Sequence, residues 1–249
     1  MPHLARSWAD DVAESLMLLT RLPVPWRLAA PRGARAAWAW PLAGAVVGLL
    51  AAGVAAGALA LGLAPPVAAA LALAAQALAT GGLHEDGLSD SADGLWGGAT
   101  PERRLEIMKD SRIGSYGALA LVLGLLIRWS ALAALFAQGA VWGPVLAAAA
   151  LSRWPMALLL GALPPAREGG LARLVGRPQA GTLLLGGLAA LVLALLASGI
   201  AALGAALAVA AIAWAWTRLV RARLGGQTGD TCGAAQQLSE IAALLALSA

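Results

Sequence analysis

The chain has 249 residues, of which 60% are hydrophobic and 12% charged, and its mean hydropathy is +0.78. Soluble globular domains carry about 25% charged residues, so this composition excludes an ordinary soluble domain and indicates a multi-pass membrane protein. A span needs about 20 apolar residues, which leaves no room for a separate soluble domain. We therefore predict one all-α domain over residues 1–249, a polytopic bundle of membrane helices.

The N-terminal residues 1–37 are predicted to form a cytoplasmic interfacial segment ahead of a transmembrane bundle over 38–248. Over residues 4–20, apolar side chains recur at spacings of three or four, and Asp10, Asp11 and Glu14 lie on other faces. This pattern is typical of an amphipathic helix that lies on a membrane surface.

Seven apolar runs predict about seven transmembrane helices. They are separated by Pro65 and Pro66, by the segment 138–144, and by Ser198 with Gly199, residue types that favour breaks between helices. The predicted spans are 38–62, 65–82, 113–137, 141–163, 181–199, 200–217 and 232–248.

The distribution of basic residues predicts the orientation of these spans. Of the 17 Lys and Arg residues, 15 fall in the N-terminal segment or in the connections 83–112, 164–180 and 218–231. With seven spans these segments share one side of the membrane, which the positive-inside rule assigns to the cytoplasm. A net charge of +4 that is distributed in this way predicts membrane topology and no nucleic-acid partner.

The connection 83–112 is predicted to contain a cytoplasmic helix near 101–110. Thr100 is a plausible N-cap, and Pro101 suits the first helical position. The connection begins with the stretch His84–Gly98, which carries four of the chain's 13 carboxylates directly after an apolar run. Anionic groups beside a hydrocarbon layer are normally retained where cations, protons or metal ions neutralise them.

Three of these carboxylates, Asp86, Asp90 and Asp93, are spaced i, i+4 and i+7, so a helix would present them on one face. Such a face suits hard cations, above all Mg²⁺ bound with waters and phosphate. The alternative is a solvated acidic loop with glycine turns. His84 is either an interfacial or structural group or a direct participant in the chemistry. Its proximity to Asp86 would allow a hydrogen bond or an orienting role.

Two arginines, Arg128 and Arg153, fall inside predicted spans. This placement costs about 2.5 to 3.5 kcal/mol on insertion scales and usually marks an internal cavity or a buried partner. The acidic stretch or a substrate phosphate would supply the anionic partner. The alternative is a structural ion pair, or snorkelling of the side chain to the membrane surface.

Two glycine-rich polar segments border predicted spans. The first contains Lys109, Asp110 and Arg112, and the second contains Thr228 and Asp230. Glycine-rich backbone beside a helix N-terminus can hold a phosphate, and an aspartate there can add a metal ligand. The alternative for each is a capped helix start.

Taken together, these motifs resemble the cobalamin synthase family, the adenosylcobinamide-GDP ribazoletransferases. The resemblance covers nearly the whole chain. Its motifs are LTRLPVP (19–25), PLAG (41–44), GGLHEDGLSDSADGLWGG (81–98), MKDSRIGSYG (108–117), SRW (152–154) and GQTGDTCGA (226–234), followed by Glu240.

The resemblance implies a Mg²⁺-dependent enzyme of vitamin B12 biosynthesis in the bacterial cytoplasmic membrane. Its substrates would be adenosylcobinamide-GDP and α-ribazole or α-ribazole 5′-phosphate, and its products GMP and adenosylcobalamin or the 5′-phosphate. Glu85 departs from the expected pattern and receives no metal role. The predicted catalytic residues are Asp86, Asp90, Asp93, Asp110, Asp230 and His84, of which the first three are the metal ligands. The predicted phosphate-binding residues are Lys109, Arg112, Arg153, Arg128 and Thr228.

Two other functions fit parts of the pattern. One is a membrane phosphotransferase that acts on another nucleotide pyrophosphate, such as a CDP-alcohol, and the other is a small ion-coupled transporter. Transporters commonly show paired repeats and ionisable groups near the midplane. Here the carboxylates cluster at the predicted cytoplasmic end and no repeat is evident, which favours an enzyme.

Overall fold

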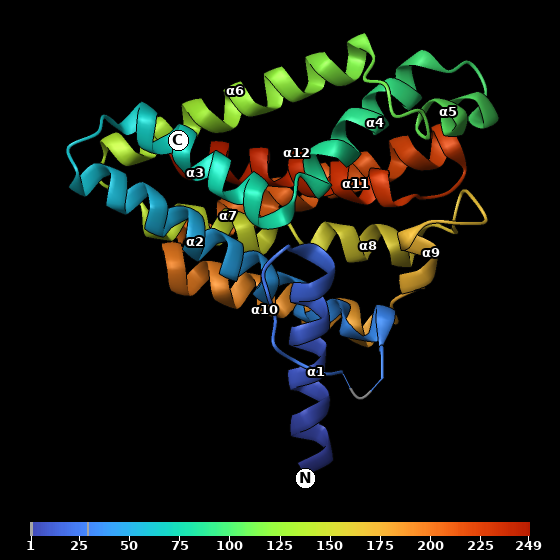
Figure 1. The fold of residues 1–249 in the computed structure, drawn as a ribbon, viewed down its shortest axis with the longest axis horizontal. Coiled ribbons are helices and arrows are strands. Elements are labelled where there is room, and N and C mark those ends of the chain that lie inside the picture. Colours follow the sequence, from blue (N-terminus) through green and yellow to red (C-terminus); the bar gives the residue numbers. More distant parts are fainter. Residues whose placement is uncertain (1, 29) are drawn as a thin grey trace.

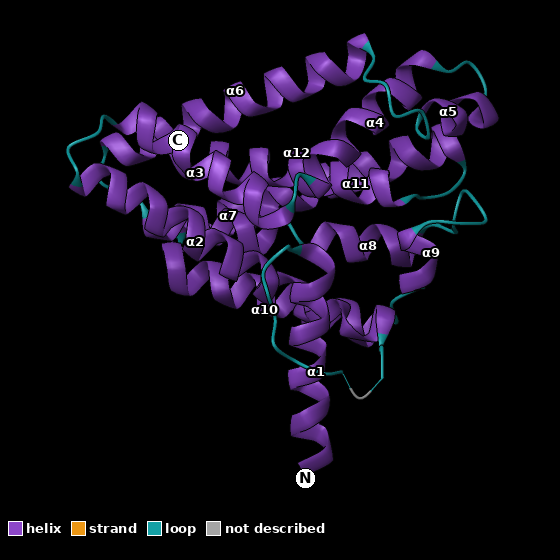
Figure 2. Cartoon of the chain, viewed as in Figure 1, coloured by secondary structure: helices purple, strands orange, loops and turns teal. Residues whose placement is uncertain are grey.

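The computed structural model describes residues 2–28 and 30–249, and residues 1 and 29 of the predicted interfacial segment lie outside them. Helices make up the described structure (Figure 2), which contains no strand and a single isolated bridge between Pro165 and Gln227. The all-α prediction is confirmed. The elements are α1 (Pro2–Leu19), the 3-10 helix η1 (Gly33–Ala39), α2 (Trp40–Ala60), α3 (Pro65–Thr80), α4 (Leu83–Gly97), α5 (Pro101–Ile107), α6 (Ser115–Ala137), α7 (Trp142–Leu151), α8 (Trp154–Ala162), α9 (Leu171–Val175), α10 (Ala180–Ser198), α11 (Ala201–Leu224) and α12 (Gly229–Ser248).

Five helical stretches in the described residues are long and apolar enough to cross a membrane, and a sixth results if α3 and α4 form one span bent by 90°. A multi-pass membrane protein is therefore confirmed, but the count of seven spans is not. Each of the seven predicted runs does form helix. The seventh run, α12, is not apolar enough to count as a span, because it carries polar residues. Its buried side chains include Gln236, Gln237 and Glu240.

The predicted helix breaks are confirmed. Helix α3 begins at Pro65, where proline is tolerated in the first turn. Helix α10 ends at Ser198, and Gly199 follows with a φ of 60° that favours glycine. Helix α5 begins after Thr100, whose side chain accepts a hydrogen bond from the Arg103 amide as the predicted N-cap should.

Figure 1 shows how the connections divide between the two ends of the molecule. The short turns 61–64 and 138–141 lie at one end, whereas α5, α9 and the loop between α11 and α12 lie at the other. Helices α4 and α12 pack against each other near this second end. The acidic stretch and the basic connections therefore share one end of the bundle.

Small residues allow α4 and α12 to pack closely. A Cβ atom at Gly87 would lie 2.7 Å from the carbonyl oxygen of Asp230 and 3.1 Å from the Cα atom of Gly233. Glycine is therefore required at Gly87 for this approach of two backbones. The contact joins the acidic stretch to the Gly-rich segment at the start of α12, 143 residues further along the chain (230 minus 87).

The acidic residues of α1 have a different role from that expected of a solvated polar face. Asp10 and Asp11 are buried and accept hydrogen bonds from the indole N–H groups of Trp26 (2.7 Å) and Trp38 (2.8 Å). Asp11 also pairs with Arg32. These contacts hold Trp26, Arg32 and Trp38 against α1. The described part of the predicted interfacial segment is therefore packed through its own polar contacts.

A buried polar network connects α3, α4, α6, α12 and the junction of α7 and α8 inside the bundle. Glu240 of α12 accepts from Arg128 of α6 and from Arg153, at the junction of α7 and α8, at 3.0 Å each. All three side chains are almost fully buried. Arg128 also donates to Gln76 of α3 at 2.5 Å and to Glu85 of α4 at 3.3 Å. The expectation of a buried anionic partner is thus met by Glu240, with a contribution from Glu85.

Loss of the Glu240 carboxylate should destabilise the whole bundle. We expect Glu240→Ala to lower the free energy of unfolding by about 3–5 kcal/mol, because it leaves two buried arginines without their shared counter-charge. Thermal unfolding in detergent measures this. The control is Glu106→Ala, which removes an exposed carboxylate paired with Arg103 at 2.9 Å and should cost less than about 1 kcal/mol. Equal melting temperatures for the two variants would contradict the assignment.

Candidate active site

A bend at Gly81 and Gly82 separates α3 from α4 and begins the candidate site. Both glycines have positive φ, 68° and 69°, which side chains disfavour. The bend turns α4 by 90° from the direction of α3. The first turn of α4 carries Leu83 and Asp86, and both residues line two adjoining pockets.

The first pocket, here called the polar cleft, lies between α4, the glycine bend and the loop before α6. Asp86, Ser89 and Asp90 line it from α4. Its other charged lining residues are Arg21, Lys109, Asp110 and Arg112. The structure therefore gathers two of the three predicted metal ligands with two of the predicted phosphate-binding residues. A cleft with both anionic and cationic side chains is suited to a metal–phosphate complex.

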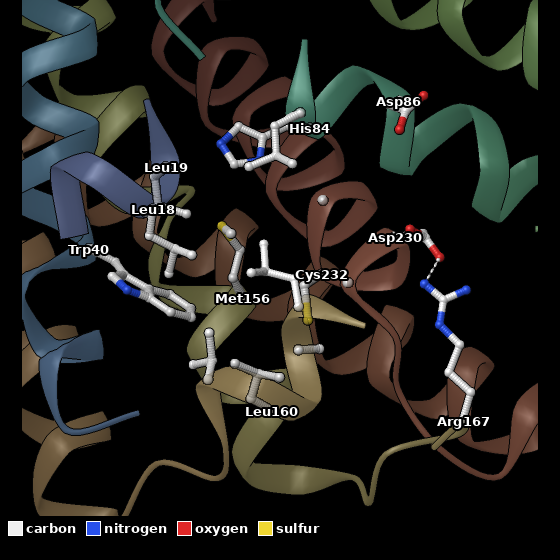
Figure 3. Close-up of a pocket in the computed structure, with 16 residues that line it drawn as sticks. Leu18, Leu19, Trp40, His84, Asp86, Met156, Leu160, Arg167, Asp230 and Cys232 are labelled. Carbon is white, nitrogen blue, oxygen red and sulfur yellow. Dashed lines mark ion pairs between the residues drawn. The ribbon is translucent and has the colours of Figure 1, made fainter. Parts of the chain in front are cut away.

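The second pocket, here called the apolar pocket, lies between α1, α2, α4, α8, α9 and α12 (Figure 3). Leu19, Trp40, Met156 and Leu160 form much of its wall. Its polar lining residues include His84, Asp86, Arg167 and Asp230. The two pockets thus meet at Asp86, which is solvent-exposed.

Asp93 does not line the polar cleft. Its two carboxylate oxygens accept from the backbone N–H groups of Gly114 at 2.7 Å and Gly117 at 2.8 Å. These groups belong to the N-terminal end of α6, where backbone donors have no partner within the helix. Asp93 is buried and holds the start of α6 against α4. The sequence reasoning did not anticipate this capping role.

No group of three His, Cys, Asp or Glu side chains in the described part of the chain converges closely enough to hold a metal ion by itself. Asp86 and Asp90 face the same cleft, while Asp93 is directed to α6. The metal role of these aspartates therefore stays a prediction. Of the three predicted metal ligands, only Asp86 and Asp90 line the polar cleft and are available there to a metal ion.

The start of α12 contributes Asp230 to the site. Its carboxylate pairs with Arg167 at 3.1 Å and accepts from the Thr228 hydroxyl at 3.1 Å. Burial raises the pKa of Asp230 above its ordinary value, although Arg167 and Thr228 act in the opposite direction. Thr228 is itself buried and forms a capping box with Thr231. The alternative interpretation of Thr228, a capped helix start, thus describes its local structure.

The exposed loop before α6 holds an ion pair between Asp110 and Arg112 at 2.7 Å. The Arg112 side chain and backbone hydrogen bonds lower the pKa of Asp110 to about 2. Asp110 is therefore ionised at neutral pH and is a weak proton acceptor. Its negative charge also neutralises the positive charge of Arg112 in this ion pair.

Besides Asp93, Asp230 and Thr228, three further predicted site residues do not line the polar cleft. Arg128 and Arg153 are engaged with Glu240 inside the bundle. His84 is buried, but neither ring nitrogen has a hydrogen-bond partner, so the expected bond to Asp86 is not formed.

Three charged residues were missed as site or network residues. Arg21 belongs to the LTRLPVP motif, and Glu240 was noted with the last motif. Glu240 also lies within a predicted span, where an ionisable residue usually indicates a functional or buried polar site. Arg167 had no signal beyond its charge.

Removing the Asp93 carboxylate should destabilise the fold at the junction of α4 and α6. We expect Asp93→Ala to lower the free energy of unfolding by about 1–2 kcal/mol, as for loss of a helix cap. Thermal unfolding of the detergent-purified protein would detect it. The exposed Glu102 offers the control Glu102→Ala, which should differ little from the wild type. An unchanged melting temperature for Asp93→Ala would show that the two amide contacts contribute nothing.

Comparison with known proteins identifies the family of this chain. The family model described as cobalamin-5-phosphate synthase matches residues 11–248. A protein of Mesorhizobium japonicum named adenosylcobinamide-GDP ribazoletransferase is 48% identical over all of this chain and 97% of its own length. Proteins of the same name from Azorhizobium caulinodans (47%; 94% of each chain) and Brucella ovis (46%; 95% of each chain) are similar. No solved structure matches. The chain belongs to the cobalamin-5-phosphate synthase family.

Proposed function

We propose that this chain is an adenosylcobinamide-GDP ribazoletransferase. It joins adenosylcobinamide-GDP to α-ribazole, or to α-ribazole 5′-phosphate, and gives adenosylcobalamin or its 5′-phosphate together with GMP. The family membership and the shared name of the relatives support this activity. They also favour it over an ion-coupled transporter and over a transferase for CDP-alcohols.

The observation that carries the proposal is the position of Asp86 between two chemically different pockets. The reaction brings together a donor with a charged pyrophosphate and an acceptor nucleoside. The polar cleft provides charged groups for the pyrophosphate, and the apolar pocket provides a wall for a less polar molecule. The reacting oxygen and phosphorus would meet where the two pockets join, beside Asp86.

Mg²⁺ is the cofactor that fits the polar cleft. This ion usually takes one or two carboxylates and completes its shell with waters and substrate phosphate, so the pair Asp86 and Asp90 is sufficient. Asp93 would join them only by giving up an amide contact to α6. When bound, Mg²⁺ would supply positive charge to stabilise the pyrophosphate oxygens during displacement of GMP.

Cationic side chains in the cleft would position the donor. Lys109 and Arg112 are exposed and line the same cleft as Asp86 and Asp90. Arg112 can exchange its exposed partner Asp110 for a phosphate with which its fork makes paired hydrogen bonds. Arg21 lines the cleft near the glycine bend. These contacts would hold the pyrophosphate so that its phosphorus is oriented for in-line attack by the acceptor hydroxyl.

Asp230 is the better candidate of two for the general base. It lines the apolar pocket beside Asp86, and burial raises its pKa. A higher pKa makes a carboxylate a stronger proton acceptor at neutral pH. Asp110, with a pKa of about 2, is much weaker. The Asp230 carboxylate would take the proton of the attacking ribose hydroxyl as the oxygen bonds to phosphorus.

The protein is proposed to lie in the bacterial inner membrane with the site facing the cytoplasm. The basic connections and the acidic stretch gather at one end of the bundle (Figure 1). This distribution matches the positive-inside rule. Nucleotide substrates are available on that side.

A direct assay tests the function. Purified protein in detergent or lipid nanodiscs is incubated with adenosylcobinamide-GDP, α-ribazole and Mg²⁺, and GMP and the cobalamin product are quantified by liquid chromatography. Folded protein that releases neither product would refute the proposal. Omission of α-ribazole distinguishes transfer from simple hydrolysis of the donor.

Asp86→Asn and Asp90→Asn should each reduce turnover by at least about 100-fold, because both remove a negative oxygen ligand from the polar cleft. Melting temperature should hardly change, since neither carboxylate has a hydrogen bond or ion pair with another described residue. Glu102→Gln makes the same chemical change at an exposed position outside the cleft and should keep full activity. Near-normal turnover in both aspartate variants would contradict the metal assignment.

Substitution of Asp230 and of Asp110 by asparagine distinguishes the two candidates for the general base. Asp230→Asn should lower kcat by about 100-fold or more, in the range of general acid–base catalysis, and should affect KM less. Asp110→Asn should act mainly on the KM of the donor, through the freed Arg112. The reverse pattern, with kcat lost in Asp110→Asn alone, would make Asp110 the base.

A further inference from the structure

The apolar pocket has features of a binding site beyond its shape. It is a partly open hollow enclosed by segments from distant parts of the chain, and small-molecule sites are usually concave and lined mostly by apolar side chains. Leu19, Trp40, Met156 and Leu160 are buried parts of its wall and come from three separate helices. Its charged groups, Asp86, Asp230 and Arg167, are together on one side, as Figure 3 shows. A ligand would therefore have one apolar end and one polar end.

His84 supplies a second, independent observation. It is 1% exposed, lines the apolar pocket, and has no hydrogen-bond partner for either ring nitrogen. An imidazole always carries at least one N–H donor, and leaving a buried polar group unpaired is costly. In Figure 3 the His84 ring lies at the apolar side of the pocket, away from the Asp230–Arg167 pair. The missing partner is therefore expected from a ligand.

We propose that the apolar pocket binds the aromatic heterocyclic base of the acceptor nucleoside, with His84 hydrogen-bonded to a ring nitrogen. This inference rests on the proposed function. The base of α-ribazole is a benzimidazole, an apolar bicyclic ring with one unsubstituted nitrogen that accepts a hydrogen bond. Its ribose would extend toward Asp86 and Asp230, which places the attacking hydroxyl at the junction with the polar cleft.

Other ligands fit this pocket less well. The guanine of the donor carries several donors and acceptors around its edge. Apart from the charged groups, the described side chains that line the pocket offer few hydrogen-bonding partners for them, His84 and Cys232. A lipid acyl chain would fill the apolar wall but would leave both His84 nitrogens unpaired. Trp40 also provides a ring face for an aromatic partner, and such pairs contribute beyond the area they bury.

Filling the pocket tests the proposal. Ala172 lies on α9 and lines the apolar pocket, while Leu174 on the same short helix is 82% exposed and does not. We expect Ala172→Trp to raise the KM for α-ribazole by at least about tenfold, because its ring occupies the space of the base. The KM for adenosylcobinamide-GDP should stay within about twofold. Leu174→Trp should leave both constants unchanged.

His84→Phe tests the hydrogen bond, because it keeps a planar ring and removes both ring nitrogens. The variant removes a buried polar group that has no partner, so its melting temperature should be equal to or above that of the wild type. Its affinity for α-ribazole, measured by calorimetry without donor, should fall by about fivefold to tenfold, as for loss of one hydrogen bond. A melting temperature that falls with unchanged affinity would make His84 structural and overturn the hydrogen bond.

The outcomes also separate this proposal from the proposed function. Wild-type protein that forms no cobalamin product refutes the function itself. Wild-type turnover combined with an unchanged KM for α-ribazole in Ala172→Trp refutes the base site alone. A rise in donor KM, with that of α-ribazole unchanged, would assign the pocket to the donor's guanine or corrinoid side and likewise overturn the proposal.

Discussion

The Glu240 carboxylate between Arg128 and Arg153 is the interaction on which the rest of the structure depends. Charges inside a membrane bundle are expensive unless they are paired and hydrogen-bonded, and here one carboxylate serves two arginines at 3.0 Å each. Because the partners come from α6, α12 and the α7–α8 junction, their positions are fixed together. Gln76 of α3 and Glu85 of α4 extend the network to both sides of the glycine bend. The start of α4, and hence the candidate site, is therefore tied to the bundle interior.

Three consecutive residues at the start of α4 show how this anchoring creates the site. A helix turns by about 100° per residue, so His84, Glu85 and Asp86 face three different surroundings. His84 faces the apolar pocket, Glu85 contacts Arg128, and Asp86 lies exposed where the two pockets meet. The carboxylates beside the apolar run thus have separate roles: one neutralises an arginine, and another is left free for a ligand.

The sequence predicted the helices and their breaks well because both depend on local patterns. Apolar runs with Pro65 or Gly199 between them leave few alternatives in a membrane chain. The shared face of Asp86, Asp90 and Asp93 was also a sound inference from helical spacing, yet only two of them reach the polar cleft. Seven residues advance a helix by about 10 Å, so Asp93 lies on the same side but further along. There it meets the amides of α6, and such a long-range partner leaves no mark in the local sequence.

The same limit applies to the arginines. Their positions in predicted spans indicated a buried partner, for which the acidic stretch and a substrate phosphate were the candidates. The main partner is instead Glu240, because the choice depends on how the helices pack. Helix α3 has 16 residues, or about 24 Å, which is shorter than the roughly 30 Å hydrocarbon layer. The bend at Gly81 and Gly82 therefore begins α4 before a full crossing is complete. Asp86, in the first turn of α4, therefore lies close to this bend, at the junction of the two pockets. The proposed function places the charged pyrophosphate on one side of this junction and the apolar ring on the other.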